Sequence, residues 1–449
     1  MEPLALHTTA NFGGIVMNET TRVRLRRLLG FGVTVVLAAP LSATAASAAT
    51  AAAPSENAAM VSDWNATAMK TLAGDANKVP VEWPLYLAFM HAAIYDAVVG
   101  VKGRYRPYLL HDHAPAGASA TAAAAAAAHK ILETYEPYAQ FDLDTALATS
   151  LADIPDGRAK ADGVAFGERV AGKLIVLRVN DGRNAPVSFT KPPAPGVWRP
   201  TPPAFAPMAV PWLGGVTPQL VNSAKQFAPP PPPALTSGRY TRDFAEVKAV
   251  GSETSTQRTA GQTATALFFS GNAVTQYNAA LRDQAAKRGL GIVQAARMFA
   301  AVDMTVSDAL ITTWRAKLLH GVWRPSTAIQ LAETDGNPAT AADPGWKPLL
   351  VNPPYPDYVS GYNAFTASFS RALEKLFGGH LHLTLTSTAV PPGVTRSYDS
   401  GRALRADVVD ARVWLGIHYR FADVAGRNLG TGLAEWTLSH HFQPVQHHG

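Results

Sequence analysis

Three clusters of cationic, hydroxyl-bearing and imidazole residues stand in the last third of this 449-residue chain. They are Lys317 with Arg324; Ser360, Gly361 and Tyr362; and Arg412 with Gly416 and His418. Planar guanidinium groups can bind several oxygens of a tetrahedral or trigonal-bipyramidal oxyanion at fixed angles, and an ammonium and a hydroxyl add further donors. His418 then remains to meet the central atom, either as a nucleophile toward phosphorus or as an axial ligand of vanadium.

The first cluster lies near the end of a long helical pattern. Lys317 and Arg324 are seven positions apart, which is about two helical turns. We therefore expect both cations on one side of the same element, which Pro325 then closes.

The other two clusters stand at predicted helix ends. The run 360–377 has helical spacing and stops at Gly378-Gly379, so Ser360 is the predicted N-cap. The first amides of such a helix, together with its dipole, favour a bound anion. In the third cluster Arg412 ends a helical pattern and Gly416 breaks it, which places His418 in a turn.

The rest of the chain is also helical in pattern, which predicts an all-α fold built as a large helical bundle. The expected helices are 58–75, 82–100, 118–136, 157–179, 257–288, 291–322, 360–377, 401–415 and 424–440, with one short strand-like run at His380 to Thr386. We expect a single helical domain over 49–449, with the oxyanion-site core at 291–440. The Pro-rich segment 184–237 is interpreted as a loop that crosses the bundle, with a linker between two helical halves as the alternative.

The clusters resemble the motifs of the vanadium-dependent haloperoxidases and the related type 2 phosphatidic-acid phosphatases: K-x6-R-P, then P-S-G-H, then S-R-x5-H-x3-D. The flanking stretches W-R-A-K-L-L-H-G-V-W-R-P-S-T-A-I and G-I-H-Y-R-F-A-D are similar to the soluble bacterial haloperoxidases. So is the early stretch from Trp64 to Asp96. The resemblance covers nearly the whole chain after its amino-terminal extension and implies the helical bundle of that family.

The resemblance implies a role for each matching residue. The oxyanion, vanadate or phosphate, would be held by Lys317, Arg324, Ser360, Gly361 and Arg412. His418 would be the ligand of vanadium in vanadate, or the nucleophile toward phosphate. The implied reactants are hydrogen peroxide and a halide, or a phosphate ester.

Tyr362 is the main departure from the family pattern, which has an acid/base histidine there. A phenol with an ordinary pKa near ~10 donates hydrogen bonds but rarely relays a proton at neutral pH. Losing such a group typically costs about 10² to 10⁴ in rate, so the resemblance implies weakened turnover.

Smaller departures surround the second and third clusters. Val359 replaces a proline and Ala411 a serine. The acidic partner is displaced to Asp423, because Ala422 occupies its usual place. Asp423 either orients the imidazole of His418 or only caps the following helix.

Composition and the amino terminus limit the remaining possibilities. The chain has no cysteine, which excludes disulfides and thiol chemistry. Its net charge is only +6 and its basic residues are dispersed, so nucleic-acid binding is not expected. The apolar run Leu28 to Ala39 follows several arginines and precedes Ala46-Ser47-Ala48, which predicts a cleaved signal peptide within residues 1–48. We therefore expect a protein that is secreted or held outside the cell membrane, with no permanent span after cleavage.

Three functions remain open at this point. The first is a vanadium-dependent haloperoxidase, and the second is an acid phosphatase that uses His418 as its nucleophile. The third is a non-catalytic or repurposed oxyanion-binding protein, which the tyrosine at position 362 suggests. The sequence does not determine the halide, the organic substrate or the oligomeric state.

Overall fold

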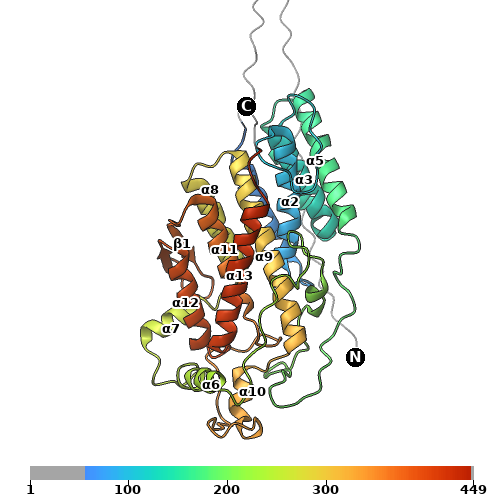
Figure 1. The fold of residues 1–449 in the computed structure, drawn as a ribbon. Helices are drawn as coiled ribbons and strands as arrows, with labels where there is room; N and C mark the ends of the chain where they lie inside the picture. Colours follow the sequence, from blue (N-terminus) through green and yellow to red (C-terminus); the bar gives the residue numbers. More distant parts are fainter. Residues whose placement is uncertain (1–55, 446–449) are drawn as a thin grey trace, which may run out of the picture. The chain divides into compact units, whose positions relative to one another are not determined.

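The computed structural model describes residues 56–445, and most of that part is helical (Figure 1). The α-helices are α1 (Met60–Gly74), α2 (Trp83–Lys102), α3 (Ala120–Tyr135), α4 (Gln140–Ala152), α5 (Arg158–Leu177), α6 (Gly238–Val250), α7 (Ala260–Phe268), α8 (Ala273–Lys287), α9 (Ile292–His320), α10 (Pro325–Gln330), α11 (Gly361–Phe377), α12 (Gly401–Trp414) and α13 (Arg420–His440). Strands β1 (Leu383–Thr386) and β2 (Thr395–Tyr398) form one antiparallel pair. The all-α prediction is confirmed. The predicted signal peptide lies outside the described residues.

Helix α9 is the central element of the bundle. It packs against α2 and against α11, and nearly all of its side chains are buried (Figure 1). Helix α2 is apolar and long enough to cross a membrane, but 94% of its apolar window is buried inside the protein. It therefore serves here as a core helix. Helix α9 ends at Gly321, whose φ of 60° is in the left-handed region that glycine adopts without strain.

Helices α11 and α13 pack against each other at very short range. A Cβ atom added to Gly426 of α13 would lie 2.3 Å from the carbonyl oxygen of Ser360, and one added to Gly430 would lie 2.3 Å from that of Ala364. The amide of Ser360 also donates to the carbonyl of Ala422 at 3.1 Å. These contacts fix the start of α11 against the first turns of α13.

The predicted helices correspond to observed ones, with two kinds of difference. The segment 257–288 forms two helices, α7 and α8, because the side chain of Asn272 accepts from the amides of Val274 and Thr275 and starts a new helix. Helices α4, α6 and α10 were not predicted. Helix α4 buries only Leu143 and so has no strong apolar stripe, whereas α6 buries Tyr240, Phe244 and Val247 at helical spacing.

The segment 184–237 contains one short 3-10 helix, at Pro211–Gly215, which packs against α9. Asp308 of α9 accepts hydrogen bonds from the amides of Gln219, Leu220 and Val221, at 2.7 to 3.0 Å. The amide of Trp198 donates to the carbonyl of Gly321 at 2.7 Å. The segment is therefore tied to the helix that carries Lys317.

Candidate oxyanion site

The described site lies where α9 ends and where α10, α11 and α13 begin. Lys317, in the last turn of α9, is fully buried, and its ammonium donates to the carbonyls of Pro356 and Asp357 at 2.6 and 3.1 Å. Burial and the neighbouring Arg324 hold the pKa of Lys317 well below its usual range. An anion beside this group would favour its charged form.

Arg324 is not on the same helix as Lys317, contrary to our expectation. Gly321 ends α9, and Arg324 is the N-cap residue of the separate helix α10. Pro325 does not close the element: it is the first residue of α10, where a missing N–H costs no hydrogen bond. The two cations converge because the chain turns between the helices.

The guanidinium of Arg324 is fully buried and surrounded by carbonyl groups. It donates from Nε to Tyr355 at 2.8 Å, from one terminal nitrogen to Ile417 at 2.8 Å and from the other to Pro353 at 3.4 Å. The nitrogen that contacts Ile417 also lies 3.3 Å from Nε2 of His418. Arg324 therefore holds the loop before Ser360 and the turn of His418 together.

His418 lies in the turn between α12 and α13, as predicted, and its carboxylate partner is Asp357. The distance from Nδ1 to Oδ1 of Asp357 is 2.6 Å, and both side chains are buried. Burial and the cations Arg324, Lys317 and Arg412 hold the pKa of His418 well below its usual value, so the imidazole is neutral. Because a carboxylate can only accept, the hydrogen resides on Nδ1, and the lone pair of Nε2 accepts a long hydrogen bond of 3.3 Å from Arg324.

Asp423 does not orient the imidazole, which corrects the expectation from the sequence. Its Oδ1 accepts from the side-chain amide of Asn363 at 2.8 Å, and that amide also lies 3.3 Å from Oγ of Ser360. Nor does Asp423 cap α13, since no side-chain bond caps that helix. Burial raises the pKa of this carboxyl well above its usual value. The sequence analysis did not predict Asp357 as the partner of His418, because Asp357 precedes Ser360 in the chain. The family motif places the acidic residue after the histidine.

Arg412 ends α12 and reaches the site from the side of Tyr362. One of its terminal nitrogens donates to the carbonyl of Phe269 at 2.8 Å, and the guanidinium lies 4.6 Å from the centre of the Tyr362 ring. Its buried Nε has no hydrogen-bond partner among the described residues. A buried charged donor without a partner is costly, so this atom is suited to an anion oxygen.

Ser360 is the N-cap residue of α11, as predicted, but its side chain does not cap the helix. The first amides of α11 therefore remain available to a ligand, whereas the hydroxyl of Ser360 is in contact with Asn363 and Asp423. Gly361 follows at the first helical position, and a Cβ atom there would lie 3.2 Å from the Trp314 ring. The glycine lets this helix end approach the cavity closely.

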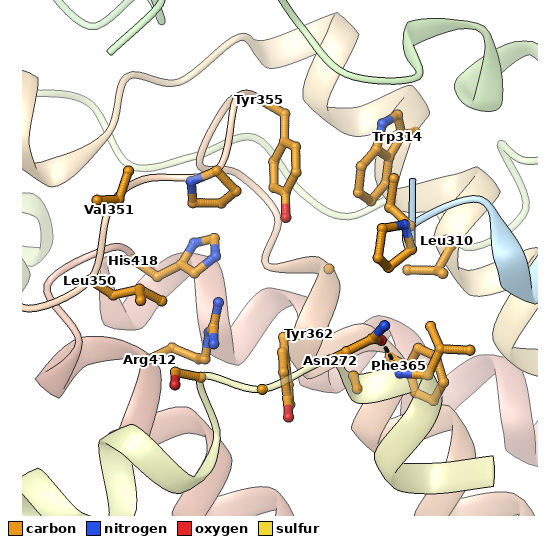
Figure 2. A pocket seen from close by; sticks show the side chains of 18 residues that line it. Asn272, Leu310, Trp314, Leu350, Val351, Tyr355, Tyr362, Phe365, Arg412 and His418 are labelled. Carbon is orange, nitrogen blue, oxygen red and sulfur yellow. Dashed lines mark hydrogen bonds between the residues drawn. The ribbon is translucent and has the colours of Figure 1, made fainter. Parts of the chain in front are cut away.

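Tyr362 faces the cavity with its ring rather than with its hydroxyl. The hydroxyl donates to Oε1 of Gln276 in α8 at 3.1 Å, and it points away from His418 (Figure 2). Burial raises the pKa of this phenol above its usual value. Tyr362 thus supports Arg412 through its aromatic face and does not direct an acid toward His418.

The side chains of His418, Arg412 and Tyr362 line one cavity of about 300 Å³, together with Gly361 (Figure 2). The remaining wall is mostly apolar and includes Leu310, Trp314, Leu350, Val351, Tyr355 and Phe365. Lys317, Arg324 and Ser360 are fully buried and do not line it. The structure brings the three clusters to one place, beside a cavity whose wall is mostly apolar.

The donor set fits a vanadate or phosphate ion. Three basic side chains are buried here beside two carboxyl groups, Asp357, whose Oδ1 is 3.9 Å from Arg324, and Asp423, whose raised pKa favours its neutral form. The basic groups outnumber the carboxyl groups, Nε of Arg412 has no partner among the described residues, and the start of α11 adds backbone amides. These features favour a multiply charged oxyanion over a cation.

Comparison with known proteins finds similar sequences and folds. Residues 297–447 match the family model described as the VCPO second helical-bundle domain. A vanadium chloroperoxidase of Curvularia inaequalis is 24% identical over 382 residues, which is 65% of this chain and 61% of that protein. The chain thus matches less than two thirds of the length of that relative.

Solved structures extend the likeness over most of the chain. A bacterial vanadium-dependent iodoperoxidase is 22% identical, with a TM-score of 0.73 over 87% of this chain and 98% of the other. An apo-type bacterial vanadium-dependent chloroperoxidase is 16% identical, with a TM-score of 0.64 over 81% and 94% of the two chains. These likenesses show the fold. The family model adds a sequence match to residues 297–447, which is less than half of the chain, so the likeness in sequence is strongest for the C-terminal bundle that carries the site.

Proposed function

We propose that the protein binds vanadate in the cavity beside His418 and oxidises a halide with hydrogen peroxide. The observation that carries the proposal is the pairing of His418 with Asp357 at 2.6 Å, which leaves the lone pair on Nε2, beside Arg324 at 3.3 Å. A neutral imidazole with its lone pair on Nε2 is what a ligand of vanadium requires, and vanadate would replace Arg324 as the partner of that nitrogen. Lys317, Arg324, Ser360, Gly361 and Arg412 would hold the oxygens of the ion. When bound, vanadate would supply the activation of peroxide for oxygen transfer to the halide.

The protein side chains have separate tasks in this proposal. Asp357 holds the proton on Nδ1 of His418, and Arg324 fixes the ring by donating to the carbonyl of Ile417. The apolar wall around Leu310 and Phe365 limits water in the cavity. In a poorly hydrated site the interactions between cations and oxyanion are stronger than in bulk water.

The phosphatase alternative uses the same residues. The pairing of Asp357 and His418 equally suits a nucleophilic imidazole, because nucleophilic attack also needs the lone pair on Nε2. The binding-only alternative is favoured by Tyr362, whose hydroxyl is engaged with Gln276.

The test compares the three functions on one preparation. Purified protein is loaded with orthovanadate and assayed for halogenation of a β-diketone with peroxide and chloride, bromide or iodide, and separately for hydrolysis of p-nitrophenyl phosphate without vanadate. We expect vanadate-dependent halide oxidation that Arg412→Ala reduces strongly, because charge-assisted bonds are worth about 1.5 to 3 kcal/mol each. Arg405→Ala is the matched control, since Arg405 is on the same helix and pairs with Glu374. Hydrolysis without halide oxidation would favour the phosphatase, and binding without either activity the third alternative.

A further inference from the structure

Tyr355 is held rigidly beside the two innermost cations. Its carbonyl accepts from Nε of Arg324 at 2.8 Å. The centre of its ring lies 4.9 Å from the ammonium of Lys317 and 5.0 Å from the guanidinium of Arg324. The ring also packs on Trp314, with 5.0 Å between ring centres. These contacts set the direction of the phenol.

The hydroxyl of Tyr355 points into the cavity that His418 and Arg412 line (Figure 2). Within residues 56–445 no hydrogen-bond partner is found for this hydroxyl, whereas the hydroxyl of Tyr362 is bound to Gln276. Phenol hydroxyls in largely apolar surroundings normally find a partner. Here the wall around it is mostly aromatic and aliphatic, so the partner is expected to be a ligand of the cavity.

We propose that Tyr355 is an anion-binding residue whose hydroxyl donates a hydrogen bond to an oxygen of the bound oxyanion. It supplies a donor that position 362 does not, because the hydroxyl of Tyr362 is bound to Gln276. The proposal rests on the proposed function for the identity of the ion, vanadate. The donor itself serves phosphate equally, because both ions present oxygen acceptors of the same kind. The hydrogen bond involves no transfer of a proton.

The test removes only the hydroxyl. Tyr355→Phe keeps the ring over Lys317 and Arg324, so the fold and the cation contacts are retained. Tyr398→Phe is the control: its hydroxyl donates to Asp407 at 2.8 Å and lies outside the residues that line the cavity. Affinities for orthovanadate and for inorganic phosphate are measured by calorimetry. We expect Tyr355→Phe to weaken both by about tenfold or more, as for a hydrogen bond to a charged group, and the control to differ by less than roughly twofold.

A spectroscopic measurement on proteins that keep Tyr355 makes the test independent of whether Tyr355→Phe folds. Saturation with phosphate should change the near-ultraviolet tyrosine difference spectrum of the parent and of Tyr398→Phe, because a phenol gains a charged acceptor. Unchanged affinity in Tyr355→Phe, no spectral change on saturation, or a parent that binds neither ion would each overturn the proposal. A parent that binds vanadate but does not oxidise halide would refute only the proposed function, since the role of Tyr355 is decided by affinity.

Discussion

Replacing Asp357 with asparagine tests whether this carboxylate sets the tautomer of His418. The side chain keeps its shape, but an amide can donate to Nδ1, and the remaining hydrogen then moves to Nε2. The 2.6 Å contact with the carboxylate is of the charge-assisted kind, worth about 1.5 to 3 kcal/mol. Since ~1.4 kcal/mol corresponds to a factor of ten, vanadate affinity at pH 8 should fall by about 10- to 100-fold.

Phosphate should respond differently from vanadate. Phosphate needs no bond from the imidazole nitrogen to its central atom, and removing Asp357 removes a negative charge 3.9 Å from Arg324. Phosphate affinity should therefore be unchanged or higher. Asp423→Asn is the matched control, because Asp423 is an equally buried carboxyl that contacts Asn363 and not His418.

The pH dependence of vanadate affinity tests the same role of Asp357 in the parent protein. Burial raises the pKa of Asp357 to about 7, against the effect of Arg324 and Lys317. Below that pH the protonated carboxyl donates to Nδ1 of His418, as asparagine does, so the parent should approach the affinity of Asp357→Asn as pH falls from 8 to 6. Calorimetric titrations with orthovanadate at these pH values measure the ratio of the affinities of the parent and of Asp357→Asn. Equal vanadate affinities of parent and Asp357→Asn at pH 8, or an equal loss in Asp423→Asn, would refute the reasoning.

Two further predictions concern stability. Oδ2 of Asp303 lies 3.4 Å from Nε2 of buried His91, and burial raises the pKa of Asp303 to about 8, so the native state keeps a proton that the unfolded chain releases. As pH rises from roughly 4 to 8, this group should lower the free energy of unfolding of the parent by about 1.4 kcal/mol per pH unit, and Asp303→Asn should lack that slope. Urea unfolding at pH 5 to 7 measures both slopes, and equal slopes in parent and variant would contradict the prediction. Gly426→Ala should lower the free energy of unfolding by about 1 to 3 kcal/mol, because its Cβ would lie 2.3 Å from the carbonyl oxygen of Ser360. Gly432→Ala should instead stabilise α13 by up to about 1 kcal/mol, because its Cβ would have no neighbour nearer than 3.7 Å. Thermal melts that rank the two variants the other way would refute the packing argument.

The sequence predicted the local positions of the candidate site residues better than their arrangement in space. Residue type and local pattern were enough for Ser360 at a helix start and for His418 in a turn, because caps and glycine breaks are local features. The separation of Lys317 and Arg324 onto two helices was not predicted, since seven residues fit two helical turns as well as a helix end and a new start. The pairing of Asp357 with His418 spans 61 positions, and no local rule reaches that far.

The proline-rich loop before Ser360 explains how so much positive charge can be buried. Pro353, Tyr355, Pro356 and Asp357 each give a backbone carbonyl to Lys317 or Arg324. Prolines have no N–H to satisfy and a fixed φ, so their carbonyls can turn toward the cations without leaving unpaired donors. Neutral carbonyls hold the cations in place but do not cancel their charge, which remains available to an oxyanion. The loop that supplies these carbonyls also carries the carboxylate of Asp357 and the hydroxyl of Tyr355. One short segment therefore positions the cations, the imidazole and a further candidate donor.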